Sequence, residues 1–357
     1  MTRPEAQAAL GAGNALLAAG DPRAAAQAFR RAIACDAGFA AAHYNLGIAL
    51  RRAGEWREAA LAFRRAARLN PADFDALQNV VDTLGNGIAS GAQPFRGREP
   101  APCHGAGEGV SVVVCSIDDE RLSRMRASFA AALEGLEHEF VVIRDARSLA
   151  EAYARALGAC RHEVVVFAHD DLELAAERPL SCLTGALGQC DLVGVAGSRR
   201  VHGPAVNWDG HPHIHGWVAY PCADGAGWDA TLYSLESGLL HGMQALDGLL
   251  IAVRRDTARR IGFDAETFDG FHFYDLDFTY RASRQGLRLA VCTDLVVFHA
   301  SQGNFGAEWN RYAERFRAKF PDLDAPAGPH HSYGFRLARS ADVARFYDAV
   351  RGLAEVQ

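Results

Sequence analysis

The chain has 357 residues, of which 49% are hydrophobic and 22% charged, with a formal net charge of −6 and eight scattered cysteines. This length allows two domains with cores of their own, and the charge argues against nucleic acid or an anionic membrane surface as the main partner. We expect no signal peptide and no transmembrane segment, and therefore a soluble, cytoplasmic protein with reduced thiols.

Residues 1–90 resemble themselves at an offset of 34. The matching pairs are Gly13/Gly47, Gly20/Gly54, Ala25/Ala59 and Phe29/Phe63. A 34-residue period of paired helices resembles the tetratricopeptide repeat. Small residues let two helices approach closely, and a glycine suits the turn between them. We therefore expect an all-α tetratricopeptide-repeat domain over residues 1–90, with a last helix over Phe74–Leu84 that Gly85 and Gly87 break.

Such repeats bind partners on a concave face, which here would carry Asn14, His43, Asn45 and Arg51. A packing or dimerisation module is the other interpretation, which we favour because two repeats offer only a short groove. Residues 91–109 contain several Gly and Pro residues and few apolar ones. They predict a linker.

From residue 110 onward, strand and helix patterns alternate. Strands are predicted at Val110–Cys115, Phe140–Ile143, Val164–Ala168 and Leu192–Ala196, with helices at Glu120–Leu136, Ser148–Cys160 and Arg178–Gln189. This order implies a parallel, doubly wound sheet in a domain over residues 110–357 that ends in C-terminal helices. No glycine-rich phosphate loop follows these strands, so a dinucleotide fold and a P-loop lose support.

The strand Val164–Ala168 leads directly into His169, Asp170 and Asp171. Ligands of open α/β sheets bind at the carboxyl ends of the strands. Adjacent carboxylates placed there can hold a divalent cation and, through it, a phosphate group. The alternative is a solvated acidic turn that begins the next helix. Ser116 and Asp145 follow two other strands and would face the same crevice.

Three later motifs complete a pattern. Leu246-Asp247-Gly248 precedes an apolar strand, residues 271–277 read Phe-His-Phe-Tyr-Asp-Leu-Asp, and His299 ends a strand. With the strand-His-Asp-Asp motif before them, these segments resemble the GT-A-fold, family 2-like nucleotide-sugar glycosyltransferases over roughly residues 109–321. The resemblance implies a Rossmann-like GT-A domain that moves a sugar from a nucleotide-diphosphate donor, with metal dependence and inversion.

The resemblance also implies roles for single residues. Asp171 and His299 would ligate Mn²⁺ or Mg²⁺, and Asp275 would be the base that deprotonates the acceptor hydroxyl. The donor-binding residues would be Ser116 and Asp145 at the nucleoside, Asp170 at the ribose, and Asp247. The chain departs from the family pattern at Ala154, where relatives often carry Asn, and at Tyr274, where many carry Glu.

Asp275 opens a predicted helix, whose dipole favours its ionised form. A plain helix-capping role is the alternative for this residue. Asp277 and Arg281 are four residues apart on the same helix, so we expect a supporting ion pair worth about 0.2–0.5 kcal/mol. Because residues two apart on a helix face different ways, only one of the two aspartates can face the crevice.

Alternating histidines lie between two tryptophans, Trp208 and Trp217; they are His211, His213 and His215. A zinc site that includes Cys222, a loop that closes over donor or acceptor, and a structural insertion are the three interpretations. We favour the loop, because structural zinc sites normally show paired ligands at tighter, recurring spacing.

The leading hypothesis is therefore a glycosyltransferase whose acceptor is a glycan, a lipid-linked glycan or a protein, with repeats that bind acceptor, partner or a second subunit. A second hypothesis is a non-catalytic adaptor that carries a degenerate transferase domain in a glycosylation complex. A third is a nucleotidyltransferase or phosphoesterase that uses the same acidic crevice, which would call for more charged residues beside the metal than the sequence offers.

Overall fold

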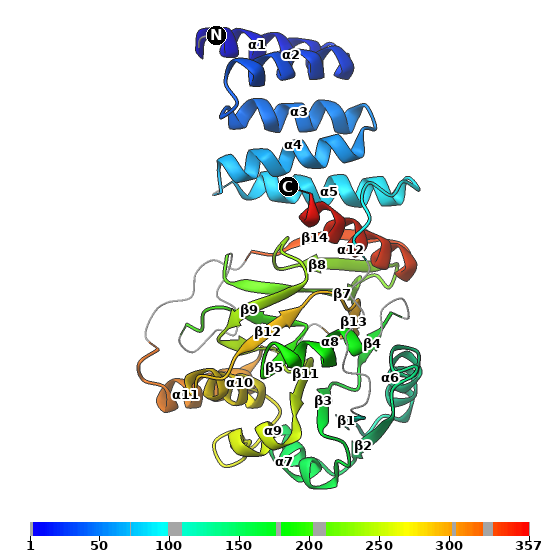
Figure 1. The fold of residues 1–357 in the computed structure, drawn as a ribbon, viewed down its shortest axis with the longest axis vertical. Helices are drawn as coiled ribbons and strands as arrows, with labels where there is room; N and C mark the ends of the chain where they lie inside the picture. The colour runs from blue at the N-terminus through cyan, green and yellow to red at the C-terminus, as the bar shows by residue number, and fades with distance from the viewer. Residues whose placement is uncertain are drawn as a thin grey trace. The chain divides into compact units, whose positions relative to one another are not determined.

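The structure is a computed structural model that describes residues 3–71, 73–98, 109–175, 180–202, 212–301, 305–323 and 331–356. The chain divides into two compact units (Figure 1). One unit joins Met1–Arg98 to Tyr333–Gln357, and the other is Glu99–Ser332. The prediction that a single domain covers residues 110–357 is therefore wrong at its end, because residues 333–357 belong with the helical unit.

The helical unit is built from antiparallel helix pairs. Its elements are α1 (Arg3–Ala18), α2 (Pro22–Cys35), α3 (Ala40–Arg52), α4 (Trp56–Leu69), α5 (Phe74–Ala89), β14 (Tyr333–Leu337) and α12 (Ser340–Glu355). A side chain on Gly13 would place its Cβ 2.4 Å from the Phe29 ring, and one on Gly47 would be 2.8 Å from Phe63. The repeat therefore depends on glycine where each helix meets the aromatic ring of the next, as predicted.

Helix α5 runs through Gly85 and Gly87 to Ala89, so the prediction that these glycines break it is wrong. A Cβ on Gly85 would lie 2.2 Å from the ring of Phe335, in β14. A Cβ on Gly87 would lie 2.9 Å from Pro94. Both glycines allow close approach of another segment within a continuous helix, a role of glycine that sequence alone does not separate from helix termination.

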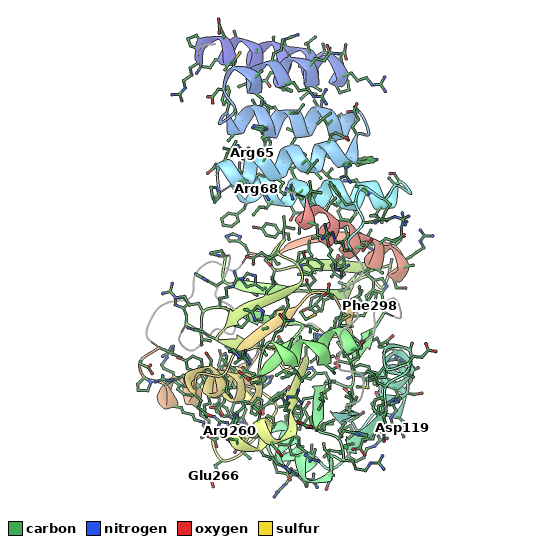
Figure 2. All side chains as sticks on the ribbon, in the orientation of Figure 1. Arg65, Arg68, Asp119, Arg260, Glu266 and Phe298 are labelled. Carbon is green, nitrogen blue, oxygen red and sulfur yellow. The ribbon has the colours of Figure 1, made fainter. Side chains whose placement is uncertain are left out.

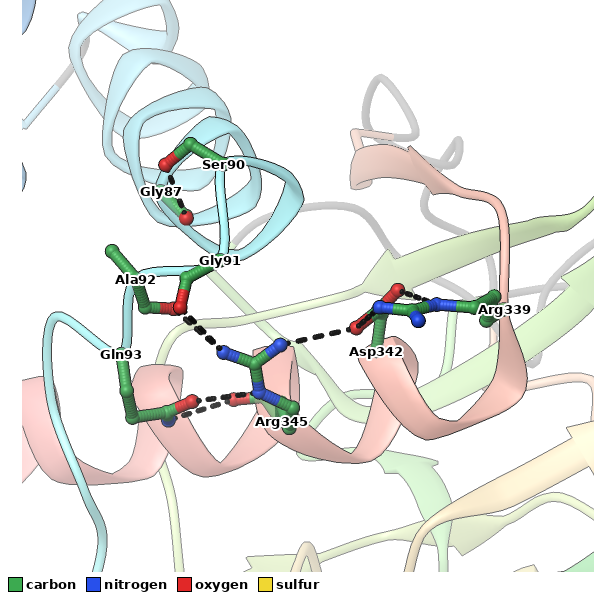
Figure 3. Close-up of polar contacts among 8 residues, drawn as sticks. All are labelled: Gly87, Ser90, Gly91, Ala92, Gln93, Arg339, Asp342 and Arg345. Carbon is green, nitrogen blue, oxygen red and sulfur yellow. Dashed lines mark hydrogen bonds and ion pairs between the residues drawn. The ribbon is translucent and has the colours of Figure 1, made fainter.

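Residues 91–98 are packed and are not a free linker, which corrects the predicted boundary. The Arg345 guanidinium donates hydrogen bonds to the Ala92 carbonyl at 2.8 Å and to the Gln93 side chain at 3.3 Å (Figure 3). Phe95 is buried, and the Arg57 guanidinium lies 4.4 Å from the centre of its ring. Contacts made by residues distant in sequence hold this segment, so its Gly and Pro content alone was misleading.

The α/β unit begins with the predicted strand–helix alternation. Its first elements are β1 (Val110–Cys115), α6 (Asp119–Ala132), β2 (His138–Ile143), α7 (Leu149–Ala159), β3 (Val164–Ala168), β4 (Leu172–Leu174), α8 (Ser181–Gly185), a 3₁₀ turn (Ala186–Gly188), β5 (Leu192–Gly194) and β6 (Ala196–Ser198). The later ones are β7 (Ile214–Pro221), β8 (Trp228–Leu232), β9 (Leu239–Met243), β10 (Ala245–Leu246), β11 (Leu250–Arg254), α9 (Arg255–Ile261), α10 (Tyr274–Arg284), β12 (Leu289–Cys292), β13 (Val297–His299) and α11 (Ala307–Lys319).

Within the described residues, the main sheet has the order β2-β1-β3-β11-β5-β12-β9. Strands β1, β2 and β3 are parallel, as predicted. Strand β11, however, runs antiparallel to both β3 and β5, and β9 runs antiparallel to β12, so the sheet is mixed. An antiparallel strand can be reached without a crossover helix, and periodicity does not reveal strand direction.

In a second sheet, β13 lies between β4 and β7. Strand β7 also pairs with β6 and β8, and β6 pairs in turn with β10. The pairing of β13 with β4 brings His299 beside Leu172, the residue after the acidic pair. The predicted helix Arg178–Gln189 is represented by α8 and its 3₁₀ turn, and residues 178 and 179 lie outside the described residues. In the described part of the chain, no helix has the length and apolar character to cross a bilayer.

Candidate active site

The predicted metal ligands meet where β3 ends. All five residues of β3 are buried, and the chain then turns into β4 at His169, Asp170 and Asp171. The His299 Nε2 atom lies 3.2 Å from the Asp171 Oδ1 atom. One ligand atom from each of His169, Asp171 and His299 lies within 4.8 Å of the other two, and no other such group occurs among the described residues. The pairing of β4 with β13 thus brings Asp171 and His299 together, although they are far apart in the sequence.

Two groups of this cluster have shifted pKa values. Burial would raise the pKa of Asp171, but the hydrogen bond and charge of His299, together with His169, outweigh it and hold that pKa well below its usual range. Burial, and then the charge of His299, lowers the pKa of His169. A neutral imidazole and an ionised carboxylate are the forms that coordinate a cation.

A second group forms where β10 turns into β11. The Gly248 N–H donates a hydrogen bond to the Asp275 Oδ2 atom at 2.8 Å. The Leu249 N–H donates to the Asp247 Oδ1 atom at 2.8 Å. Asp275 lies in the first turn of α10. Burial, and then the charge of Asp247, raises the pKa of Asp275 to about 7, against the effect of the Gly248 N–H. The aspartate proposed as a base therefore has a pKa near neutral pH.

Asp277 faces away from this group and is a structural residue, as predicted. Its carboxylate is 1% exposed and lies 2.8 Å from Arg281 Nε and 2.6 Å from Lys319 Nζ. Arg281 also donates hydrogen bonds to the carbonyls of Ile261 and Gly262. The sequence predicted a supporting pair worth about 0.2–0.5 kcal/mol. In the structure the carboxylate of the pair is buried and contacts a second cation from α11, so its removal should cost more than predicted.

The remaining predicted site residues follow neighbouring parallel strands. The Ser116 hydroxyl donates a hydrogen bond to the Asp118 carbonyl at 3.0 Å. Asp145 is exposed and accepts two hydrogen bonds from the Arg155 guanidinium, at 2.8 and 2.9 Å. Asp170 is partly buried at the end of β3. Burial raises the pKa of Cys115 to about 12, and the charges of Asp170 and Asp145 contribute to this increase, so both carboxylates lie near the end of β1.

Two residues of the site were not assigned from the sequence. His169 is two residues before Asp171, and that spacing was the available signal. Tyr274 lies beside the predicted base, and its hydroxyl lies 2.9 Å from the His169 Nε2 atom and 3.4 Å from the Gly248 carbonyl. Phe298, the residue before His299, packs its ring 4.7 Å from that of Trp228 and anchors the strand (Figure 2).

The His-rich segment contributes no metal group within the described residues. Trp208 and His211 lie outside the described residues. His215 is buried, and its Nδ1 atom lies 3.1 Å from the Ser234 hydroxyl. The Cys222 thiol lies 3.5 Å from Asp229. The loop and insertion hypotheses stay predictions.

Comparison with known proteins identifies the family of the α/β unit. Residues 111–320, more than half of the chain, match the model of a "Glycosyltransferase like family". The chain belongs to this family. Residues 10–74 match the tetratricopeptide-repeat model. The prediction of a glycosyltransferase domain with N-terminal tetratricopeptide repeats is thereby confirmed.

No curated protein matches the chain. Among solved structures, a mannosyltransferase from Pyrobaculum calidifontis in complex with GDP-Man and Mn²⁺ is 15% identical, with 84% of this chain and 82% of that one covered and a TM-score of 0.39. A GalNAc transferase with UDP, GalNAc and Mn²⁺ is 11% identical, with coverages of 69% and 55% and a TM-score of 0.38. A protein from STIV is 13% identical, with coverages of 54% and 86% and a TM-score of 0.34. The family assignment rests on the match to the family model.

Proposed function

We propose that the α/β unit transfers a sugar from a nucleotide-diphosphate donor to an acceptor hydroxyl with inversion, and that the reaction depends on a divalent cation. One observation carries the proposal: a group of candidate cation ligands is connected through Tyr274 and Gly248 to a carboxyl group with a pKa of about 7. The acceptor is a glycan, a lipid-linked glycan or a protein, and the tetratricopeptide repeats serve acceptor or partner binding.

The residues present fit a cation. Ligands at about 2.1 Å from an ion and at right angles to each other are about 3 Å apart, and the His299 Nε2 and Asp171 Oδ1 atoms are 3.2 Å apart. Two imidazoles with one carboxylate suit Mn²⁺ better than Mg²⁺, which prefers oxygen ligands. A bound cation supplies Lewis-acid charge for the diphosphate leaving group. The donor would also contact Asp170, Asp145 and Ser116 at the strand ends.

Asp275 acts as the general base in this proposal. The acceptor oxygen forms a bond to the anomeric carbon while the bond from that carbon to the diphosphate oxygen breaks. The hydroxyl proton passes to the Asp275 carboxylate, and the electron pair of the broken bond stays on the nucleoside diphosphate. Attack from the face opposite the leaving group inverts the anomeric centre. A base with a pKa of about 7 matches the usual requirement for proton transfer at neutral pH.

The test is titration calorimetry of the full chain with UDP and GDP, in Mn²⁺, in Mg²⁺ and in EDTA. We expect tight binding only with a cation, because no glycine-rich phosphate loop follows the strands to neutralise the diphosphate. Binding should be tighter with Mn²⁺ than with Mg²⁺, because two of the three candidate ligands are imidazoles. Asp171→Asn should weaken binding at least about 10-fold through loss of a ligand. Asp119→Asn is the matched control, since Asp119 is exposed and paired with Arg144 (Figure 2). Equal binding in EDTA, or by the Asp171→Asn variant, contradicts the proposal.

A further inference from the structure

We infer that Tyr274 is a positioning residue that orients His169 for the cation and links the cation site to the peptide that holds Asp275. This inference rests on the proposed function, because it concerns the same cation site.

The hydroxyl of Tyr274 has a single proton to donate, and its neighbours are the Tyr153 hydroxyl, His169 and the Gly248 carbonyl. It lies 2.9 Å from the His169 Nε2 atom and 3.4 Å from the Gly248 carbonyl oxygen. The carbonyl can only accept, so the arrangement that satisfies both contacts has Tyr274 donate to Gly248 and accept from the Nε2–H of His169. That leaves the His169 Nδ1 atom unprotonated. The opposite arrangement would put the imidazole proton on Nδ1 and occupy the lone pair of Nε2, which would leave no nitrogen for a cation.

Tyr274 is fixed in place by the residue before it. Phe273 has a φ of +64°, and it is the only non-glycine residue with positive φ among the described residues. Such a conformation costs on the order of 1–3 kcal/mol and persists only where packing enforces it. The Phe273 ring packs 5.1 Å from Trp309 and 5.7 Å from Phe316, both in α11. Helix α11 therefore holds the start of α10 in the conformation in which the Tyr274 hydroxyl lies 2.9 Å from His169 Nε2.

Gly248 completes the link. A Cβ at this position would lie 2.2 Å from the Tyr274 hydroxyl and 2.8 Å from the Asp275 Cβ, so only glycine fits between them. Gly248 accepts a hydrogen bond from Tyr274 through its carbonyl oxygen, and its N–H donates to the Asp275 Oδ2 atom at 2.8 Å. A continuous path of hydrogen bonds thus runs from His169 through Tyr274 and Gly248 to Asp275. Loss of the hydroxyl would free both the imidazole and this turn.

The experiment compares Tyr274→Phe with Tyr280→Phe, a buried tyrosine on the same helix that makes no contact with His169 in the described structure. Mn²⁺ binding to the full chain is measured by calorimetry without nucleotide, and circular dichroism checks folding. We expect Tyr274→Phe to weaken Mn²⁺ binding about 10–100-fold, the usual effect of removing a hydrogen-bond partner of a ligating histidine. Tyr280→Phe should bind as the wild type does. Unchanged binding by Tyr274→Phe overturns the inference.

A double-variant cycle separates positioning from general stability. In a His169→Ala background, Tyr274→Phe should cause no further loss, because the hydroxyl acts through His169. A further loss of the same size overturns the inference. Histidine ¹⁵N spectra of the wild type give a readout that needs no variant: His169 should carry its proton on Nε2, and a proton on Nδ1 contradicts the argument. If the wild type binds no Mn²⁺, the proposed function fails first, which distinguishes the two failures.

Discussion

The two ends of the candidate active site treat carboxyl groups in opposite ways. At the β3–β13 end, the hydrogen bond and charge of His299, together with the charge of His169, outweigh burial and hold the pKa of Asp171 well below its usual range. At the β10–β11 turn, burial and the charge of Asp247 raise the pKa of Asp275 to about 7. Carboxyl groups whose pKa values are pushed apart suit different tasks, and this difference supports the proposal that Asp171 stays ionised beside the cation while Asp275 accepts the proton.

The comparison also explains why the two ends come from different parts of the chain. Imidazoles and a carboxylate meet through the β4–β13 ladder. Asp275 is instead held by the Gly248 N–H at the turn that carries Asp247, close enough for the charge of Asp247 to act on it. Like charges at close range are costly, so the second arrangement persists only because the surrounding fold imposes it. Such an imposed contact is more informative about function than a favourable ion pair.

The largest expected effect concerns Asp275. Asp275→Asn should lower the single-turnover rate of sugar transfer by about 10²–10⁴-fold at saturating donor and Mn²⁺, the usual contribution of positioned proton transfer. Donor affinity should change little, because the cation ligands are at the other end of the site. Asp277→Asn is the matched comparison on the same helix and should keep a far higher rate per folded molecule. If Asp277→Asn is the inactive variant and Asp275→Asn the active one, the roles assigned to the two ends are wrong.

Several candidate site residues could be predicted from the sequence because they directly follow strands. Ser116, Asp145, Asp170 and Asp171 were placed by the rule that ligands bind at the carboxyl ends of parallel strands, and those strands are parallel in the structure. The glycines of the repeat were likewise readable, because the same local contact occurs twice at a fixed offset.

What the sequence did not reveal depends on contacts between distant segments. The antiparallel direction of β11, the packing of residues 91–98 on α12 and the continuation of α5 through Gly85 are all set by partners elsewhere in the chain. The contact of Tyr274 with His169 belongs to the same class, since 105 positions separate the two residues. Periodicity describes which face of an element is buried, but not what covers it.

The second prediction concerns stability at the structural side of α10. Asp277→Asn should reduce the free energy of unfolding by about 1–3 kcal/mol, because it removes the charge of a buried carboxylate that pairs with the partly buried Arg281 and Lys319, although Lys319 keeps its pair with Asp264. Urea unfolding of the full chain, followed by fluorescence, measures this difference. Asp322→Asn is the control, since Asp322 is exposed and pairs with Arg284 at the surface; it should cost less than about 1 kcal/mol. A loss for Asp277→Asn as small as that of the control would mean that the pair is not buried in solution.

The smallest expected effect is a shift in pH dependence, and it tests the contrast between the two ends most directly. Asp275 must be ionised to accept a proton, so kcat/KM should rise with pH and level off above about 7. The titratable groups that face it are Asp247, Tyr153 and Tyr274, and burial raises the pKa of both tyrosines, so Asp247 alone supplies charge near neutral pH.

Asp247→Asn removes that negative charge and should therefore lower the pKa of Asp275, which moves the rising limb to lower pH by about one unit. The position of the midpoint is the readout, because a lower plateau could follow from any loss of donor contacts by Asp247. Asp145→Asn, which removes an exposed carboxyl group paired with Arg155, should leave the midpoint unchanged. A midpoint that stays near pH 7 in Asp247→Asn would show that burial alone raises the pKa, and the turn before β11 would then be a scaffold for Asp275 without an electrostatic part in its activation.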